Sequence, residues 1–224
     1  MHDCLIIGIA GPSGSGKSTL CRSLQRRIGY DICTTIEMDH YYRDQGHLSP
    51  AARDALDYDA PEMVEMDLLV EHLRALAAGA SVRVPRYEFA THTRTGFGRL
   101  AAPSPVVLVE GLFCLTSLEL RECLDWSVFV ATDDSACLAR RLSRDVAARA
   151  RTPEQVYTQY RTHVRPAAER HVLPSVFHAR RVVMGTRPPD ELCDEILADL
   201  SALVPECRFW PRRAPDALAA PRAP

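Results

Sequence analysis

The length and charge of the chain exclude several classes of protein. Its 224 residues suit one α/β domain, and 46% hydrophobic with 25% charged residues is the composition of an ordinary globular protein. A formal net charge of −2 gives no reason to expect a nucleic acid or a membrane surface as a partner. The apolar runs are too short for a membrane span and the first residues lack the features of a signal peptide, so we expect a cytoplasmic protein.

The cysteines and the basic residues add two restrictions. Eight cysteines are scattered without Cys-x-x-Cys spacing, which favours reduced, mostly buried thiols over a zinc site or a disulfide framework. The 27 basic residues comprise 26 arginines and one lysine, Lys17. This single lysine marks a position where a compact ammonium serves and a planar guanidinium does not.

Apolar runs of strand length alternate with helical patterns along the chain. The expected strands are continuous apolar runs, typical of a parallel sheet buried on both faces, at residues 5–9, 32–38, 106–109, 126–130 and 181–184. The expected helices cover residues 18–27, 61–78, 155–177 with an interruption near Pro166, and 189–203. A further helix is capped at residues 132–134 and carries an apolar stripe of Leu138, Leu142 and Val146. This alternation predicts an α/β fold with a three-layer, doubly wound parallel sheet.

Two segments depart from the alternation. Residues 82–89 alternate between apolar and polar like a short antiparallel strand, so we expect a small β-hairpin insert at about residues 80–100. From Pro205 the chain is rich in proline, alanine and arginine, and we expect residues 205–224 to form a disordered tail. The main domain would then span residues 1–204.

A phosphate-binding loop follows the first expected strand. Residues 11–18 match Gly-x-x-x-x-Gly-Lys-Ser, whose glycines let backbone N–H groups converge on phosphate oxygens at the start of a helix. Lys17 would reach the β- and γ-phosphates, and the Ser18 hydroxyl would be placed for Mg²⁺. The residues expected to bind ATP, or GTP as the alternative donor, are Gly11, Ser13, Gly14, Ser15, Gly16, Lys17, Ser18 and Thr19.

The rest of the sequence narrows the class of P-loop protein. A GTPase needs an Asn-Lys-x-Asp base reader, and an ABC ATPase needs a Leu-Ser-Gly-Gly-Gln signature; the chain contains neither. Asp39 and Glu110 each follow an expected strand, and the strand ends of a doubly wound sheet face one crevice. Asp39 could accept a proton from an attacking alcohol, and both carboxylates could hold Mg²⁺. This set suits a small-molecule kinase.

Several short segments, in order along the chain, resemble the uridine–cytidine kinases. They are Met38–Asp44, Tyr58–Pro61, Pro85–Arg94, Val109–Leu112, the arginine-rich run from Arg140 to Arg151, Gln159–Tyr160 and Val164–Pro166. The resemblance covers about residues 4 to 200 and includes an Arg-rich helical lid at about residues 140–165. It implies a P-loop kinase that phosphorylates the 5′-hydroxyl of uridine and cytidine with ATP, giving UMP and CMP in pyrimidine salvage. It also implies a homotetramer.

The resemblance assigns the catalytic and metal-binding roles. Asp39 would be the general base on the nucleoside 5′-hydroxyl. Lys17, Arg144 and Arg149 would stabilise the transferred phosphoryl group, because arginines there can neutralise its charge. The residues implied to hold Mg²⁺ are Ser18, Glu110 and Asp39.

The resemblance also assigns the nucleoside pocket. An acidic residue, Asp59, would accept hydrogen bonds from the ribose 2′- and 3′-hydroxyls with help from Arg141. His92 and Arg151 would face the polar edge of the base, and aromatic faces would frame its plane. The implied substrate-binding residues are Tyr42, Tyr58, Asp59, Tyr87, Phe89, His92, Arg141, Arg151 and Gln159.

Three departures from the family pattern leave some alternatives open. Ala60 stands where the family has histidine, Ala150 where it has glycine, and residues 185–188 match its adenine-facing loop weakly. These departures leave the base preference and the donor preference open. The alternatives to a uridine/cytidine kinase are a related kinase of another alcohol, such as phosphoribulose or pantothenate, and a nucleotide-binding regulatory module without turnover.

Overall fold

The computed structural model describes residues 4–149 and 151–203. The departure at Ala150 and the predicted tail at residues 205–224 lie outside these ranges. None of the helices in the described part of the chain combines the length and the apolar character needed to cross a bilayer.

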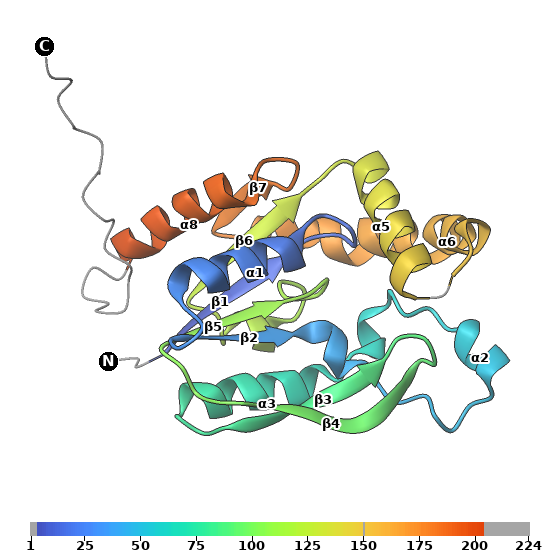
Figure 1. Ribbon diagram of the computed structural model, residues 1–224, viewed down its shortest axis with the longest axis horizontal. Coiled ribbons are helices and arrows are strands. Elements are labelled where there is room, and N and C mark those ends of the chain that lie inside the picture. Colours follow the sequence, from blue (N-terminus) through green and yellow to red (C-terminus); the bar gives the residue numbers. More distant parts are fainter. Residues whose placement is uncertain (1–3, 150, 204–224) are drawn as a thin grey trace, which may run out of the picture.

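A five-stranded parallel sheet forms the centre of the molecule (Figure 1). Its strands lie in the order β2 (Cys33–Glu37), β5 (Val106–Glu110), β1 (Leu5–Ala10), β6 (Trp126–Ala131) and β7 (Arg181–Met184). The five predicted strands and the α/β class are therefore confirmed. The connections that leave β1 and β5 run in opposite directions across the sheet, which places a crevice at the carboxyl ends of these two strands.

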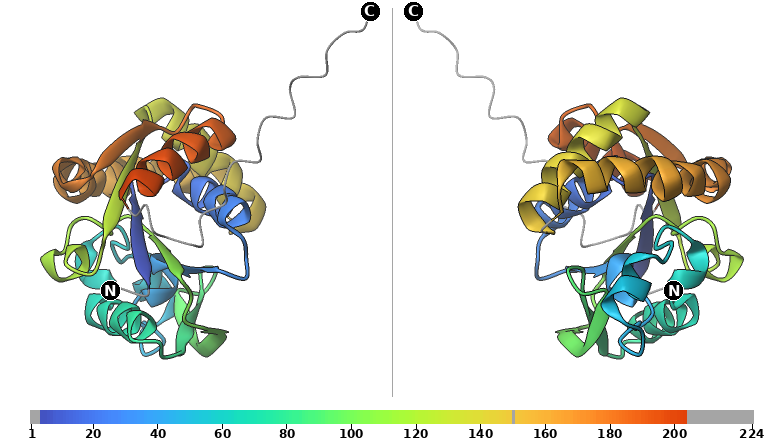
Figure 2. Two further views of the ribbon diagram at one scale, coloured as in Figure 1. Left: turned by 90° about the vertical axis from the view of Figure 1, so that its left-hand side faces the viewer. Right: turned by 90° about the vertical axis from the view of Figure 1, so that its right-hand side faces the viewer.

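Helices cover both faces of the sheet, as the continuous apolar strands predict. Leu5, Ile7 and Ile9 of β1 pack in one buried cluster with α1 (Lys17–Ile28) and α8 (Pro189–Leu203). Ile6 and Ala10 of the same strand point to the other face, into a cluster with α3 (Met66–Ala77). Because successive side chains of a strand point to opposite faces of the sheet, those of β1 enter two separate apolar cores. Figure 2 shows α8 and α3 at opposite ends of the molecule.

An antiparallel pair of strands lies where the hairpin is predicted. It consists of β3 (Val82–Glu88) and β4 (Thr93–Ala101), and it forms a sheet of its own. Val82, Val84 and Tyr87 are buried against the core of the α3 face. The turn of the hairpin therefore projects towards the carboxyl end of the main sheet, beside a 3-10 turn at Met38–Tyr41.

The helix predicted from residue 61 begins later. Pro61–Met63 is a 3-10 turn, and α3 starts only at Met66. Between them Val64 forms an isolated bridge with Tyr42, and the Glu65 N–H donates to the Tyr41 carbonyl at 2.9 Å. The backbone of this segment is thus paired with residues 41–43, which the helical spacing of its apolar residues does not reveal.

The helix α5 (Asp134–Ala148) begins where the cap predicts, but it buries a different face. The predicted stripe ends on Val146, whose exposed fraction is 42%. The buried residues are instead Cys137, Arg141 and Asp145, spaced by four. The prediction of an apolar stripe is wrong here because α5 turns polar side chains towards a polar pocket, where ion pairs replace apolar contacts.

Helical turns continue from residue 153 to residue 178. They comprise α6 (Pro153–Gln159), a π-helical turn at Tyr160–Val164, α7 (Arg165–Ala167), a second π-helical turn at Ala168–Val172 and a 3-10 segment at Leu173–His178. The predicted interruption near Pro166 is a change of hydrogen-bond pattern rather than a break. Wide π turns relieve the clash between a proline ring and the preceding turn, so the chain stays helical. Two short helices complete the fold, α2 (Pro50–Asp54) and α4 (Leu118–Arg121).

Candidate active site

A pocket of about 420 Å³ opens at the carboxyl ends of β1, β2 and β5. Its walls are the phosphate loop, the hairpin and the arginine segment, which we define as residues 140–149 with Arg151. Every predicted site residue lines this pocket except Gly11 and Ser15. Predicted site residues as far as 146 positions apart in the sequence, Ser13 and Gln159, therefore come together in this one pocket.

Gly11 and Ser15 support the phosphate loop from behind. A Cβ on Gly11, whose φ is +144°, would overlap the carbonyl oxygen of Val130. The Ser15 carbonyl accepts hydrogen bonds from Thr132 Oγ1 at 2.9 Å and from Arg140 Nη1 at 3.1 Å. Gly11 and Ser15 therefore shape the phosphate loop, and the other predicted residues of the loop line the pocket.

The reactive end of the loop carries the lysine and the serine. Lys17 Nζ donates to the Pro12 carbonyl at 2.9 Å, and the lysine is buried. Ser18 Oγ donates to Glu110 Oε1 at 2.6 Å, which links α1 to the end of β5. Burial raises the pKa of the Glu110 carboxyl, while Lys17 and the Ser18 hydrogen bond act in the opposite direction. A hydroxyl, a carboxylate and an ammonium thus meet beside the loop.

Asp39 lines the same pocket from the 3-10 turn that follows β2, near enough to Glu110 to contribute to the raised pKa of that carboxyl. Glu37 lines the same pocket at the end of β2, and the parallel register places it beside Glu110 of β5. In the described ranges, no three His, Cys, Asp or Glu side chains gather closely enough to hold a metal ion by themselves.

The pocket continues from Asp39 to a buried carboxylate, Asp59. Arg141 Nη1 lies 4.0 Å from Asp59 Oδ1, and both side chains are at least nine-tenths buried. Burial raises the pKa of Asp59, and the Arg141 guanidinium works against that rise. A carboxylate with Arg141 as its nearest cation, and with Arg151 also acting on its pKa, is thus held away from solvent at this point.

Aromatic rings form the far end of the pocket. The Tyr58 and His92 rings stack with centroids 4.0 Å apart and an interplanar angle of 13°, and Tyr42 lies 5.3 Å from Tyr87. His92 has a φ of +53°, and such strained backbone in a non-glycine residue is characteristic of functional sites. His92 Nε2 lies 3.4 Å from Arg151 Nη2. Because an arginine only donates hydrogen bonds, this nitrogen of His92 acts as the acceptor.

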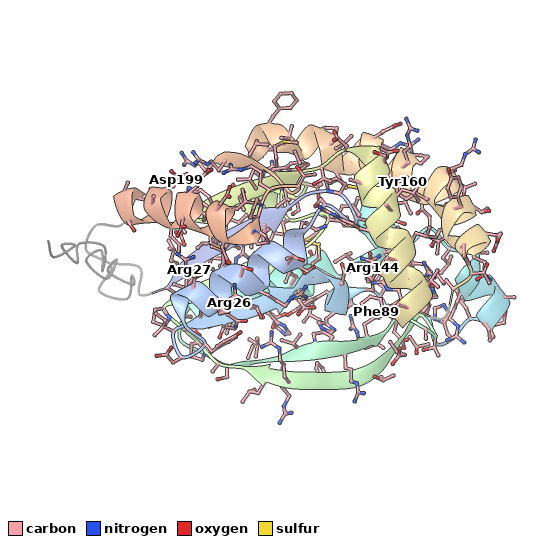
Figure 3. All side chains as sticks on the ribbon, turned by 45° about the horizontal axis from the view of Figure 1, so that its top comes forward. Arg26, Arg27, Phe89, Arg144, Tyr160 and Asp199 are labelled. Carbon is pink, nitrogen blue, oxygen red and sulfur yellow. The ribbon has the colours of Figure 1, made fainter. Side chains whose placement is uncertain are left out.

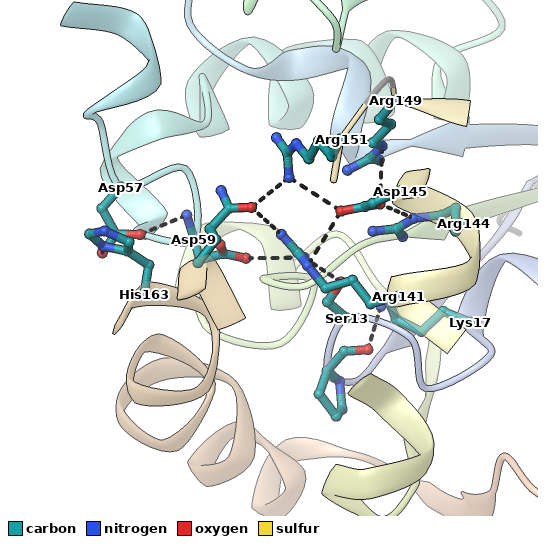
Figure 4. Close-up of polar contacts among 12 residues, drawn as sticks. Ser13, Lys17, Asp57, Asp59, Arg141, Arg144, Asp145, Arg149, Arg151 and His163 are labelled. Atoms are coloured by element: carbon teal, nitrogen blue, oxygen red, sulfur yellow. Dashed lines mark hydrogen bonds and ion pairs between the residues drawn. The ribbon is translucent and has the colours of Figure 1, made fainter. Parts of the chain in front are cut away.

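Four arginines of the arginine segment surround one carboxylate, Asp145 (Figure 4). The ion-pair distances to its two oxygens are 3.5 Å for Arg141, 2.8 Å for Arg144, 3.6 Å for Arg149 and 3.2 Å for Arg151. Burial acts to raise the pKa of Asp145, but the surrounding arginines outweigh it, and the pKa lies below its usual range. Arg144 from α5 and Phe89 from the hairpin face the same pocket (Figure 3).

Sequence reasoning missed several residues of the site. Arg22, Glu37, Leu112 and Arg140 also line the pocket, and Asp145 lies directly behind it. The parallel register could have indicated Glu37, and helical spacing of four from Ser18 could have indicated Arg22. Arg140 donates to the carbonyls of Ser15 and Gly185, contacts for which the sequence holds no signal.

Comparisons with known proteins place this site in a family. The model of the phosphoribulokinase/uridine kinase family matches residues 6–189. The uridine kinase of Shewanella amazonensis is 44% identical over 186 residues, which cover 81% of this chain and 88% of that protein. The uridine kinase of Cronobacter sakazakii is 41% identical over 186 residues, with coverage of 81% and 87%.

Two solved structures share the fold at low identity. A possible uridine kinase from Bacillus stearothermophilus has a TM-score of 0.53 at 20% identity, covering 80% of this chain and 87% of that one. The phosphoribulokinase from Rhodobacter spheroides has a TM-score of 0.56 at 17% identity, covering 84% and 74%. The predicted α/β fold and the predicted class of enzyme, a nucleoside kinase, are confirmed. The chain belongs to the phosphoribulokinase/uridine kinase family.

Proposed function

We propose that this protein transfers the γ-phosphoryl group of ATP to the 5′-hydroxyl of uridine and cytidine, giving UMP and CMP. One observation carries the proposal: Lys17 of the phosphate loop, Asp39 and the buried Asp59 line a single pocket. The pocket thus combines a phosphate site, a base for an alcohol and an acceptor for a diol. The uridine kinases that this chain resembles support the choice of nucleoside.

Asp39 acts as the general base in this proposal. Its turn follows β2 at the same edge of the sheet as the phosphate loop, so a hydroxyl bound beside it faces the γ-phosphate. A carboxylate at hydrogen-bond distance from that hydroxyl removes its proton as the new O–P bond forms. The leaving group is ADP, and the proton passes to Asp39.

Asp59 selects ribose. A buried carboxylate accepts hydrogen bonds from both vicinal hydroxyls, and it is left incompletely paired when one hydroxyl is missing. Arg141 beside it balances its charge and donates to Ser13 Oγ of the phosphate loop at 2.9 Å. Arg141 thereby joins the ribose end of the pocket to the donor end.

The rings and His92 hold the base. The faces of Tyr42, Tyr87 and Phe89 suit a flat heterocycle, and His92 lines the same pocket. A neutral imidazole carries one donor and one acceptor, so a base that takes the place of Arg151 at His92 can offer either the O4 of uridine or the amino group of cytidine. Gln159 accepts hydrogen bonds from Arg141 and Arg151 and fixes the edge of this pocket.

The oxygen donors beside the loop fit Mg²⁺. This ion binds through one or two carboxylates together with substrate phosphates, and it takes oxygen ligands. Ser18, Glu110 and Asp39 supply a hydroxyl and two carboxylates in the pocket. When bound there, the ion would neutralise charge on the phosphates, as it does in other P-loop kinases.

Lys17, Arg144 and Arg149 stabilise the transferred phosphoryl group. All three line the pocket as cations, and charge develops on the phosphoryl oxygens during transfer. We extend the proposal to a cytoplasmic enzyme of pyrimidine salvage that assembles as a homotetramer, on the strength of the family resemblance and of the charge and composition of the chain.

The test is a coupled assay of ADP release with ATP and one acceptor at a time. Uridine and cytidine should give rapid ADP release, while 2′-deoxycytidine, adenosine and the reaction without acceptor should give little. Ribulose 5-phosphate and pantothenate serve as the acceptors of the related kinases. ADP release that ignores uridine and cytidine but follows one of these two would overturn the proposal, and so would ATP binding without turnover of any acceptor.

A further inference from the structure

The carboxylate of Asp145 has an unusual position relative to the pocket. Its side chain is fully buried and does not line the pocket, whereas all four of its arginine partners do. It therefore lies behind the arginines and cannot touch a bound substrate. A carboxylate that only stabilised the fold would have no need to gather four pocket arginines.

We propose that Asp145 is a positioning residue for phosphoryl transfer: it holds the arginines from behind so that their terminal nitrogens face the substrates. The inference rests on the proposed function, in which Arg144 and Arg149 face the transferred group. It adds a role for a buried side chain that touches no reacting atom.

The nitrogen that each arginine uses supports this role. Arg144 donates its Nε–H to Asp145 at 2.8 Å, and Arg141 and Arg149 face the same carboxylate with Nε at ion-pair distances of 3.5 and 3.6 Å. A guanidinium bound through Nε keeps its two terminal nitrogens available on the far side of its plane. Among the described side chains, which do not include that of Asp54, none accepts a hydrogen bond from the terminal nitrogens of Arg144 or Arg149. These nitrogens are thus available to bind an anion.

The balance of charge points to the same ligand. Four guanidinium groups share the carboxylate of Asp145, and Arg141 also has Asp59 within 4.0 Å. The described lining of the pocket carries seven cationic side chains against four carboxylates, with Asp145 as a fifth behind it, so an excess of positive charge remains beside the phosphate loop. A polyphosphate supplies the missing negative charge. Without Asp145 the excess would be larger, but the orientation of the guanidinium planes would be lost.

Asp145 also reaches the nucleoside end of the pocket. Arg151 contacts Asp145 at 3.2 Å through Nη1 and lies 3.4 Å from His92 through Nη2. The backbone carbonyl of Asp145 accepts the N–H groups of Arg149 and Arg151 at 3.1 and 3.4 Å. One residue thus sets both the side chains and the backbone of the arginine segment where it leaves α5.

The first test is Asp145→Asn, which keeps the shape and removes the charge. We expect kcat to fall at least about tenfold, because the terminal nitrogens of two arginines lose their aim. The Kd for uridine should rise by a smaller factor than kcat falls, since Asp59 and the aromatic rings remain and only Arg141 and Arg151 of the nucleoside pocket lose a partner. Inorganic tripolyphosphate should inhibit the variant as well as or better than the wild type, because the pocket gains one net positive charge. Asp134→Asn is the matched control: it removes another ion-paired carboxylate of α5, 54% exposed, and should keep wild-type kcat.

Two results would overturn the inference. One is a kcat of Asp145→Asn within twofold of the wild type. The other is a loss of kcat accompanied by equal losses of uridine and tripolyphosphate binding, which is the signature of a purely structural role. A wild-type enzyme that fails to phosphorylate any nucleoside would instead overturn the proposed function.

Arg144→Lys keeps the test decisive if Asp145→Asn does not fold. Arg144 is 39% exposed, so lysine fits there without disturbing the core. A lysine keeps the charge, but a single ammonium cannot pair with Asp145 and reach a phosphate from opposite sides of a plane. We expect kcat to fall about tenfold with the Kd of ATP nearly unchanged. A wild-type kcat in Arg144→Lys would show that catalysis does not require the Arg144 guanidinium to be held through its Nε, and this would overturn the inference.

Discussion

Arg149 lies over the ring of Phe89, with its guanidinium carbon 4.4 Å from the ring centroid. The two residues come from the end of α5 and from the hairpin, and both line the pocket. The arginine that we propose to face the transferred phosphoryl group thus directly contacts an aromatic side chain of the same pocket. Burial and the neighbouring Arg144 lower the pKa of Arg149, while Asp145 and Asp39 act in the opposite direction. The face of the Phe89 ring is a further favourable neighbour for a cation.

Phe89→Leu tests this contact. The substitution keeps an apolar side chain but removes the aromatic face, and a cation–π contact is worth about 0.5 to 2 kcal/mol. We expect kcat to fall by about 2- to 30-fold and KM for uridine to rise, measured by ADP release. Phe97→Leu is the control, because Phe97 lies on the same hairpin with 64% of its surface exposed. Equal effects of the two substitutions would contradict a specific role for Phe89.

Asp39→Asn tests the general base. The amide keeps the size of the side chain but cannot take the proton of the 5′-hydroxyl, so we expect kcat to fall by about 10²- to 10⁴-fold. The Kd for ATP, measured by calorimetry, should stay within a few-fold of the wild type because the phosphate loop is intact. Asp31→Asn, an exposed carboxylate before β2, should leave kcat unchanged. A fully active Asp39→Asn enzyme would rule out the assignment.

Asp59 gives a prediction about pH and sugar specificity. Because burial raises its pKa, Asp59 takes up a proton at a higher pH than the ordinary value of about 3.9. The carboxylate accepts from both hydroxyls only above that raised pKa, so the kcat/KM ratio of uridine to 2′-deoxyuridine should fall as the pH falls through it. In Asp59→Asn this ratio should be lower and independent of pH. A wild-type ratio that stays constant from neutral to acidic pH would argue against Asp59 as the diol acceptor.

The parts of the fold that depend on apolar patterning could be predicted from the sequence. The strand β1 is buried on both faces, so its unbroken run Leu5–Ile9 carries a clear signal, and the glycines of the phosphate loop follow it directly. The edge strand β7 carries a similar apolar run and could be predicted from it, although only Val183 of this strand is buried and Val182 is half exposed. Such elements can be predicted locally, because a run of consecutive apolar residues is recognisable without knowledge of its contacts with the rest of the chain.

The parts that depend on polar pairing could not be predicted in the same way. α5 buries Arg141 and Asp145 rather than Leu142, because its inner face meets a polar pocket and the ion pairs exist only after folding. The late start of α3 depends on the bridge between Tyr42 and Val64, which joins segments that no periodicity connects. The site residues inferred from the resemblance lie around one pocket, but no sequence signal distinguishes Asp145, because a single carboxylate within an arginine-rich run is typical of a charged helix surface.

Acid unfolding provides a further measurement on Asp145. Its arginine partners lower its pKa in the folded state, so between the folded and unfolded pKa values the unfolded chain binds more protons. The stability that these partners contribute is therefore complete above the ordinary value of about 3.9 and is lost as the pH falls towards the lowered value. The free energy of unfolding of Asp145→Asn, from urea titrations, should vary less with pH between about 5 and 3 than that of the wild type. Identical pH dependence in the two proteins would contradict the ion-pair cluster.

Two kinds of contact hold α8 against the rest of the molecule, and their contributions to stability can be measured separately: buried apolar side chains and exposed ion pairs. Ile196 is fully buried in the cluster that α8 shares with β1 and α1, so Ile196→Ala should lower the free energy of unfolding by about 2 to 5 kcal/mol. Arg26 of α1 pairs with Asp190 of α8 at 2.9 Å, but the two side chains are 59% and 66% exposed. Such exposed pairs contribute at most about 1 kcal/mol, so Arg26→Ala should lower the free energy by less than about 0.5 kcal/mol after screening. Urea unfolding of both variants at low and high salt checks this. A larger loss in Arg26→Ala than in Ile196→Ala would mean that charge, rather than apolar contact, holds α8 against the sheet.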